Sequence, residues 1–193
     1  MVPHRGGHVT EAELITGLPT ATASTWALAS RSVSVPGLTM EDRLGIDDLL
    51  TRYATAIDGR DWELLDTVFT DSAHLDYRSA GGVAGDYAEV KQWLAEVLPI
   101  LGVTQHHIMN RFVRVDHGQV RSTSTFLNIN VLTIKNAPWI FKVGGRYHDR
   151  LVVEGDTWQI AERIEDTLWW ENPMPGLPPF PAPVDGLLDT VPH

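Results

Sequence analysis

Apolar residues recur at three- and four-residue spacing in the first clearly patterned part of the chain, from about residue 41 onward. This period predicts an amphipathic helix that ends at Gly59. Asp61 stands where it can cap a short second helix, with Phe69 on the apolar face of that helix. A third helix is predicted over about residues 86–98, before a proline that cannot continue it.

The chain after residue 104 consists of long strand-like runs separated by short polar turns. Together with a short run at 73–77, they predict strands at 105–115, 120–134, 139–153 and 157–170. Short turns between consecutive strands favour an antiparallel meander, and helices followed by strands are typical of an α+β fold. We therefore predict three helices packed on a strongly curved, mostly antiparallel sheet, which forms a cone-shaped α+β barrel.

Pattern and composition divide the chain into three parts. Residues 1–39 are rich in Gly, Pro, Ser and Thr with little periodicity, so we predict a flexible N-terminal extension there. Residues 40–172 are predicted to form one folded domain. Residues 173–193 hold too many prolines to continue a sheet, and we predict a C-terminal tail.

Charge and cysteine content narrow the function classes. Fifteen Lys and Arg residues against 25 Asp and Glu residues give a formal net charge of -10 over 193 residues. This balance disfavours nucleic acid and anionic membranes as partners, and no apolar run is long enough to span a bilayer. The chain has no Cys, which excludes disulfides and thiolate metal sites and is typical of a cytoplasmic protein.

The strongest candidates for chemistry are Asp58, at the end of the first helix, and His106, at the start of the first long strand. An imidazole transfers protons near neutral pH, and a nearby carboxylate fixes its tautomer. If both reach one apolar pocket, the protein is an acid–base enzyme. The alternative is a half-buried structural histidine and an ordinary helix-ending aspartate. Because strand side chains alternate, His106 and His107 cannot both point inward.

Other kinds of site have weaker support. His74 and Asp76 share a strand face but lack a third metal ligand, and the paired glycines lack the spacing that binds phosphates. No nucleophile elbow is present for serine catalysis. We therefore expect no metal and no cofactor. Asp149 and its arginine neighbours are expected to form a solvated charge cluster on the sheet.

Residues 40–172 resemble the SnoaL-like branch of the nuclear-transport-factor-2-like superfamily, which includes scytalone dehydratase, bile-acid 7α-dehydratase and hexachlorocyclohexane dehydrochlorinase. Five segments carry this resemblance, in the same order along the chain: residues 53–62, 76–79, 104–106, 144–149 and 156–158. Together they span most of the domain. The resemblance implies the cone-shaped fold, a small-molecule pocket and a homodimer or higher homo-oligomer.

The resemblance also implies roles for individual residues. In these lyases an Asp that ends the first helix orients a His on the first long strand, and Asp58 and His106 stand at those places. Tyr53 matches a catalytic tyrosine and Tyr77 a substrate- or water-binding tyrosine. The candidate substrate-binding residues are Tyr77, Ser124, Asn128, Tyr147 and Trp139. Ile57 replaces a second pocket tyrosine of scytalone dehydratase, which argues against scytalone itself as the substrate.

The implied activity is a cofactor-independent elimination of the dehydratase type. The expected substrate is a small hydrophobic cyclic carbonyl compound, such as a polyketide, terpenoid or steroid. The same acid–base site also suits an isomerase or a polyketide cyclase. A further alternative is non-catalytic, namely a small subunit of a ring-hydroxylating dioxygenase or a ligand-binding module. Retention of both Asp58 and His106 favours an enzyme over that alternative.

Overall fold

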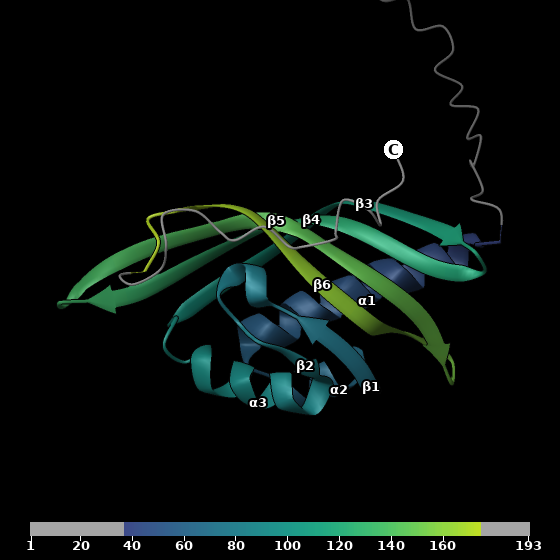
Figure 1. The fold of residues 1–193 in the computed structure, drawn as a ribbon, viewed down its shortest axis with the longest axis horizontal. Coiled ribbons are helices and arrows are strands. Elements are labelled where there is room, and N and C mark those ends of the chain that lie inside the picture. The colour runs from purple at the N-terminus through teal and green to yellow at the C-terminus, as the bar shows by residue number, and fades with distance from the viewer. Residues whose placement is uncertain (1–36, 175–193) are drawn as a thin grey trace, which may run out of the picture. The chain divides into compact units, whose positions relative to one another are not determined.

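Six strands form one sheet that carries three helices on one side (Figure 1). The structure is a computed structural model and describes residues 37–174. The predicted N-terminal extension, up to residue 36, and the predicted tail, from residue 175, lie outside the described residues. No helix in the described range is long and apolar enough to cross a membrane.

The predicted helices and strands occur in the predicted order, with a short 3₁₀-helix and a short strand in addition. They are α1 (Met40–Gly59), α2 (Trp62–Asp66), β1 (Phe69–Asp76), the short 3₁₀-helix η1 (Arg78–Ala80), β2 (Ala84–Asp86), α3 (Tyr87–Val97), β3 (Val103–Asp116), β4 (Gln119–Ile134), β5 (Ala137–Glu154) and β6 (Thr157–Glu171). The spatial order of the strands is β2-β1-β6-β5-β4-β3. Strands β3 to β6 form the predicted antiparallel meander.

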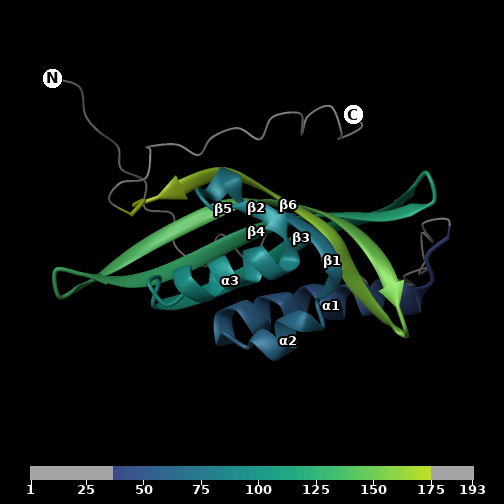
Figure 2. The same cartoon turned by 60° about the horizontal axis from the view of Figure 1, so that its bottom comes forward.

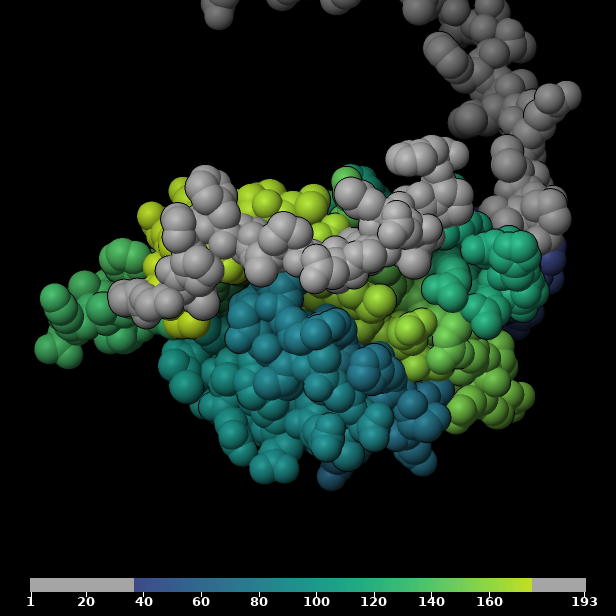
Figure 3. Space-filling model, in the orientation of Figure 1, coloured from purple at the N-terminus to yellow at the C-terminus, as the bar shows by residue number. Residues whose placement is uncertain are grey.

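The predicted α+β class is confirmed, with helices packed on a curved, mostly antiparallel sheet. Strand β1 is the exception, because it pairs in parallel with β6. Figure 2 shows α1 and α3 on the same side of the sheet. In the space-filling view, the blue-to-teal atoms that include η1, β2 and α3 pack directly against the strands beside them (Figure 3).

One boundary prediction was wrong, and one short strand was missed. Phe69, which we assigned to the second helix, is the first residue of β1, four residues before the predicted strand start at residue 73. Its side chain is buried and contacts the rings of Tyr53 and Tyr87. The short strand β2 was not predicted. It consists of Ala84–Asp86 and pairs with the end of β1, so only its tertiary partner identifies it.

Helix α1 begins with a capping box, in which Thr39 Oγ1 accepts from the backbone N–H of Asp42 and the Asp42 carboxylate accepts from that of Thr39. The predicted end at Gly59 is confirmed, but the residue in the left-handed conformation is Arg60, with φ of 55°. That conformation costs a residue with a Cβ roughly 1–2 kcal/mol, so other contacts must hold Arg60 in place.

The inner face of the sheet carries polar groups as well as apolar ones. Along β4, alternate residues are buried on this face: Ser122, Ser124, Phe126, Asn128, Asn130 and Leu132. On β6 the same alternation buries Arg163, Glu165 and Thr167. Buried polar groups are costly unless they are paired. This face of the sheet is therefore where a functional site is expected.

Candidate active site

A cavity of about 240 Å³ lies between the helices and the inner face of the sheet. Its walls are mostly apolar and aromatic, and a few polar groups reach into it. The lining residues are Tyr53, Ile57, Tyr77, Ala80, Gly81, Trp93, Leu94, Val97, Leu98, Leu101, His106, Asn128, Asn130, Phe141, Val143, Tyr147, Glu165 and Met174. An apolar chamber with few polar groups is typical of a small-molecule site.

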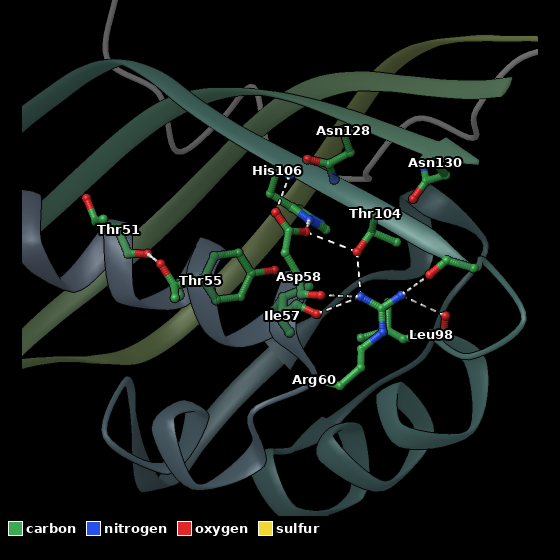
Figure 4. A network of polar contacts seen from close by, with 12 residues as sticks. Thr51, Thr55, Ile57, Asp58, Arg60, Leu98, Thr104, His106, Asn128 and Asn130 are labelled. Atoms are coloured by element: carbon green, nitrogen blue, oxygen red, sulfur yellow. Dashed lines mark hydrogen bonds and ion pairs between the residues drawn. The ribbon is translucent and has the colours of Figure 1, made fainter. Parts of the chain in front are cut away.

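Asp58 and His106 meet at the edge of this cavity (Figure 4). The Asp58 Oδ1 atom lies 2.6 Å from Nδ1 of the His106 ring, and Oδ2 accepts a 2.8 Å hydrogen bond from the His106 backbone N–H. Thr104 Oγ1 donates a third hydrogen bond, of 3.0 Å, to Asp58 Oδ1. The carboxylate is therefore held by three donors from the first residues of β3.

This arrangement defines what the imidazole can do. The Asp58 carboxylate accepts from Nδ1–H, so in the neutral ring Nε2 carries the lone pair and can act as a proton acceptor. The His106 side chain is 8% exposed and that of Asp58 is 26% exposed. Partial burial raises the pKa of Asp58, but the hydrogen bonds from His106 and Thr104 outweigh it and hold this pKa below its usual value. The carboxylate thus stays ionised at neutral pH.

Arg60 connects the helix end to the strand start, and the sequence analysis missed it. Its guanidinium donates five hydrogen bonds: to the carbonyl oxygens of Ile57, Asp58, Leu98 and Gly102, and to Thr104 Oγ1. These bonds offset the strain of its left-handed backbone and account for a conformation that glycine usually adopts. Arg60 thereby fixes the position of Asp58 relative to Thr104 (Figure 4).

We predict that Arg60→Ala lowers kcat by about tenfold or more, because Asp58 loses its fixed position, while KM changes little. The free energy of unfolding should fall by roughly 1–3 kcal/mol. The matched control is Arg52→Ala, which removes another α1 arginine that donates to backbone carbonyl oxygens, those of Thr67 and Trp158. Kinetics and urea unfolding of both variants check this. Equal loss of kcat in both variants would contradict a positioning role for Arg60.

Three tyrosines form the wall next to His106. The Tyr53 ring packs edge-on against the His106 ring, with centroids 6.2 Å apart, and its hydroxyl lies 3.3 Å from that of Tyr77. The Tyr147 ring contacts Tyr53 at 5.7 Å, and Asn128 Nδ2 donates to its hydroxyl. Burial raises the pKa of all three phenols. They are therefore neutral at physiological pH, and each hydroxyl keeps a proton that it can donate.

A buried ion pair lies behind these tyrosines. Arg163 donates two hydrogen bonds to Asp149, of 2.7 and 2.8 Å, and both side chains are 0% exposed. The guanidinium lies over the rings of Tyr53 and Tyr147, 4.1 and 4.2 Å from their centroids. The prediction that Asp149 belongs to a solvated cluster was therefore wrong. Asp149 points inward because it is two residues from Tyr147 on the same strand.

Glu165 is a second titratable group in the cavity wall, and it was also missed from the sequence. It is 6% exposed, and its Oε1 atom accepts a 3.0 Å hydrogen bond from Thr167 Oγ1. Burial raises the pKa of Glu165 to about 7, against the opposing effects of Thr167 and Arg163. Both charge states of this carboxyl are therefore accessible at neutral pH.

This raised pKa predicts how stability depends on pH. The folded state keeps the Glu165 proton up to about pH 7, whereas the unfolded chain releases it near the ordinary glutamate value of 4.5. The folded state binds more protons in this window, so the free energy of unfolding falls as pH rises through it, by roughly 3 kcal/mol for this group. Urea unfolding at pH 5 and pH 8 should show that Glu165→Gln lacks this decrease. The prediction is contradicted if the difference in unfolding free energy between Glu165→Gln and the wild type is the same at pH 5 and at pH 8.

The structure brings together most of the predicted site residues. Tyr77, Asn128 and Tyr147 line the cavity together with His106 and Tyr53. Ser124 and Trp139, by contrast, lie outside the cavity lining. Ser124 is completely buried, and Trp139 is exposed with its indole N–H donating to the Asn172 carbonyl. The structure therefore gives neither of these two residues a place against a ligand.

Comparisons with known proteins agree with this architecture. A family model for the SnoaL-like domain matches residues 38–164. An uncharacterized protein of Mycobacterium tuberculosis (strain ATCC 25618 / H37Rv) is 40% identical over 126 residues, which cover 65% of this chain and 85% of that protein. An uncharacterized protein of Mycobacterium bovis matches to the same extent.

Solved structures of similar fold include two from Novosphingobium. The protein named "Putative Scytalone Dehydratase" from Novosphingobium aromaticivorans superposes with a TM-score of 0.62 at 18% identity, over 73% of this chain and 93% of that chain. The hexachlorocyclohexane dehydrochlorinase of Novosphingobium barchaimii superposes with a TM-score of 0.59 at 15% identity, over 71% of this chain and 92% of that chain. At these identities the likeness concerns the fold.

Proposed function

Because the chain belongs to the SnoaL-like family, we propose that it is a cofactor-independent lyase that removes water from a small hydrophobic cyclic carbonyl compound. The observation that carries this proposal is the pairing of His106 with Asp58 at the edge of an apolar cavity. The names of two structural neighbours, "Putative Scytalone Dehydratase" and hexachlorocyclohexane dehydrochlorinase, also support an elimination.

The first chemical step is the removal of a proton from the carbon next to the substrate carbonyl. His106 Nε2 accepts this proton, and the nearby Asp58 carboxylate stabilises the resulting imidazolium. Negative charge then develops on the carbonyl oxygen, where either the Tyr53 or the Tyr77 hydroxyl is available as a donor while the other donates to its neighbour. A general base contributes about 10²–10⁴-fold, and one oxyanion donor about 10²–10³-fold.

The second step completes the elimination. The electron pair of the enolate forms a carbon–carbon double bond, and the carbon–oxygen bond of the hydroxyl on the β carbon breaks. This hydroxyl leaves as water once it has received a proton. Arg163, behind the tyrosines, supplies a fixed positive charge that favours the anionic intermediate.

Cavity size restricts the substrate. Pockets for drug-sized ligands measure roughly 300–1,000 Å³, and this cavity measures about 240 Å³. A compound of one or two rings therefore suits it better than a four-ring steroid. The stacked pair of Tyr77 and Trp93 gives the cavity a flat aromatic wall, which favours a planar ring.

A fluorogenic probe tests the proposal. An α-tetralone with a hydroxyl on the carbon β to the carbonyl loses water to give α-naphthol, which fluorescence detects. We expect the wild-type protein to catalyse this conversion. An isomerase would instead convert a β,γ-unsaturated cyclic ketone into its α,β-unsaturated isomer with the oxygen retained, without releasing α-naphthol from this probe. Tight binding without turnover would indicate a ligand-binding module and contradict the proposal.

A further inference from the structure

The elimination proposed above uses the Asp58–His106 dyad and the tyrosines, and it leaves Glu165 without a role. This residue lines the same cavity as His106 but comes from β6, whereas His106 comes from β3. Strands β5 and β4 lie between them in the sheet. The pairing register also offsets them along the sheet, because His106 faces Asn128 of β4 whereas Glu165 faces Tyr147 of β5, which is paired with Ser124 of β4. A ring compound in the cavity can therefore meet the two side chains at different positions.

The contacts of Glu165 differ from those of the buried carboxylate next to it. Asp149 is paired with Arg163 through two hydrogen bonds. The Glu165 side chain has no ion-pair partner within residues 37–174, and its one hydrogen bond there is the bond from Thr167 Oγ1 to Oε1. A buried carboxyl group that only stabilises a fold is normally fully paired. The second oxygen of Glu165 is thus available to a ligand.

The electrostatic surroundings favour the protonated form of Glu165 up to about pH 7. Burial is the largest cause, and the carboxylates of Asp166 and Asp76 act in the same direction. Arg163 opposes them, but both of its bonds to a carboxylate are directed at Asp149. A protonated carboxyl group in an apolar cavity is an O–H donor. Glu165 can therefore donate a proton to the leaving group, whereas the Asp58–His106 dyad acts on the other side of the cavity.

We propose that Glu165 is the general acid of the reaction, which protonates the departing hydroxyl on the side of the cavity opposite His106. This inference rests on the proposed function. It extends the site to substrates whose leaving group needs a proton, namely β-hydroxy cyclic ketones, whereas substrates that lose halide do not require the acid. His106 then acts as the general base and Glu165 as the general acid.

The step balances in protons and electrons. His106 Nε2 takes the α proton, and the carbon–hydrogen bonding pair becomes the new carbon–carbon π bond. The carbon–oxygen bonding pair leaves with the hydroxyl oxygen, which takes the proton from Glu165 and departs as water. His106 is left protonated and Glu165 ionised. Transfer of one proton from His106 to Glu165 through solvent restores both, and no oxidant or reductant is needed.

Paired probes test this assignment. The β-hydroxy-α-tetralone described above requires protonation of its leaving group, whereas β-chloro-α-tetralone loses chloride without it and gives the same α-naphthol. Glu165→Gln should turn over the hydroxy probe about 10²-fold more slowly than wild type and the chloro probe within about threefold of wild type. In the wild type, turnover of the hydroxy probe should decline above about pH 7 and that of the chloro probe should not. Glu162→Gln is the matched control, since Glu162 lies on the same strand and pairs with Arg150 instead of lining the cavity.

The outcomes separate this inference from the function on which it rests. His106→Ala should slow both probes, and if it slows neither, the proposed function fails. If Glu165→Gln slows both probes equally, or slows neither, the assignment of Glu165 as the acid is overturned while the dyad stands.

An infrared measurement gives a test that needs no turnover. The wild-type protein should show a protonated-carboxyl band that Glu165→Gln lacks. Binding of β-hydroxy-α-tetralone should shift this band, because the acid then donates to the ligand hydroxyl. Absence of the band, or a band that the probe leaves unmoved, would also overturn the assignment.

Discussion

Replacement of His106 by alanine should slow conversion of the β-hydroxy-α-tetralone probe by about 10²–10⁴-fold, which is the usual contribution of a general base. The imidazole borders the cavity, and its Nε2 lone pair can accept the proton while Asp58 holds Nδ1–H. The ring is mostly buried but borders the cavity, so its removal enlarges an existing space more than it breaks core packing. The free energy of unfolding should therefore change much less than the rate.

Asp58→Asn should cause a loss of similar size. An amide cannot stabilise the imidazolium, and it no longer selects the tautomer with the proton on Nδ1. The matched control is His107→Ala, which removes the neighbouring imidazole outside the cavity lining. Steady-state kinetics with circular dichroism of each variant checks the prediction. Full activity in either dyad variant, or equal loss in His107→Ala, would contradict the assigned roles.

Asp149→Leu should lower the free energy of unfolding by about 3–5 kcal/mol, the usual cost of leaving one member of a buried ion pair alone. Asp149 and Arg163 are both 0% exposed, and the guanidinium would lose both hydrogen bonds to the carboxylate. Its Nη1 atom already lacks a hydrogen-bond partner inside the described part of the chain. Denaturant unfolding of the variant and the wild type measures the change.

A double variant supplies the control for this second prediction. Asp149→Leu combined with Arg163→Met removes both charges, and replacing a whole buried pair by apolar groups is often close to neutral. The double variant should therefore recover much of the stability lost in Asp149→Leu. If the two changes simply add, the loss reflects packing volume and not an unpaired charge. The double variant should still be slow in turnover, because the tyrosines lose the cation behind them.

The sequence alone predicted the order of the main elements well, for identifiable physical reasons. Helix α1 has a strong apolar period and clear end signals, and the four strands of the meander are long and joined by short turns. Such patterns depend on neighbours along the chain. By contrast, β2 exists only because it pairs with β1, and Phe69 is a strand residue because β1 pairs with β6. Local patterns hold no information on such long-range pairing.

The candidate site was predicted only in part. Asp58 and His106 were found because their residue types and the family resemblance agreed. Arg60 was missed because Gly59 accounted for the helix end, and its five hydrogen-bond acceptors come from three parts of the chain. Glu165 had one local signal. It alternates with Arg163 and Thr167 along β6, so a count of inward-facing polar residues on that strand would have found it.

Hydrogen exchange at a ketone tests the central claim most directly, which is that the pairing of His106 with Asp58 forms a base facing the cavity. α-Tetralone has protons next to its carbonyl but no leaving group, so in deuterated water the base can only exchange them, and proton NMR follows the exchange. We predict that the wild type accelerates this exchange and that Glu165→Gln does so equally. His106→Ala and Asp58→Asn should not accelerate it. Exchange that is equally fast with wild type and His106→Ala would show that the dyad is not the base.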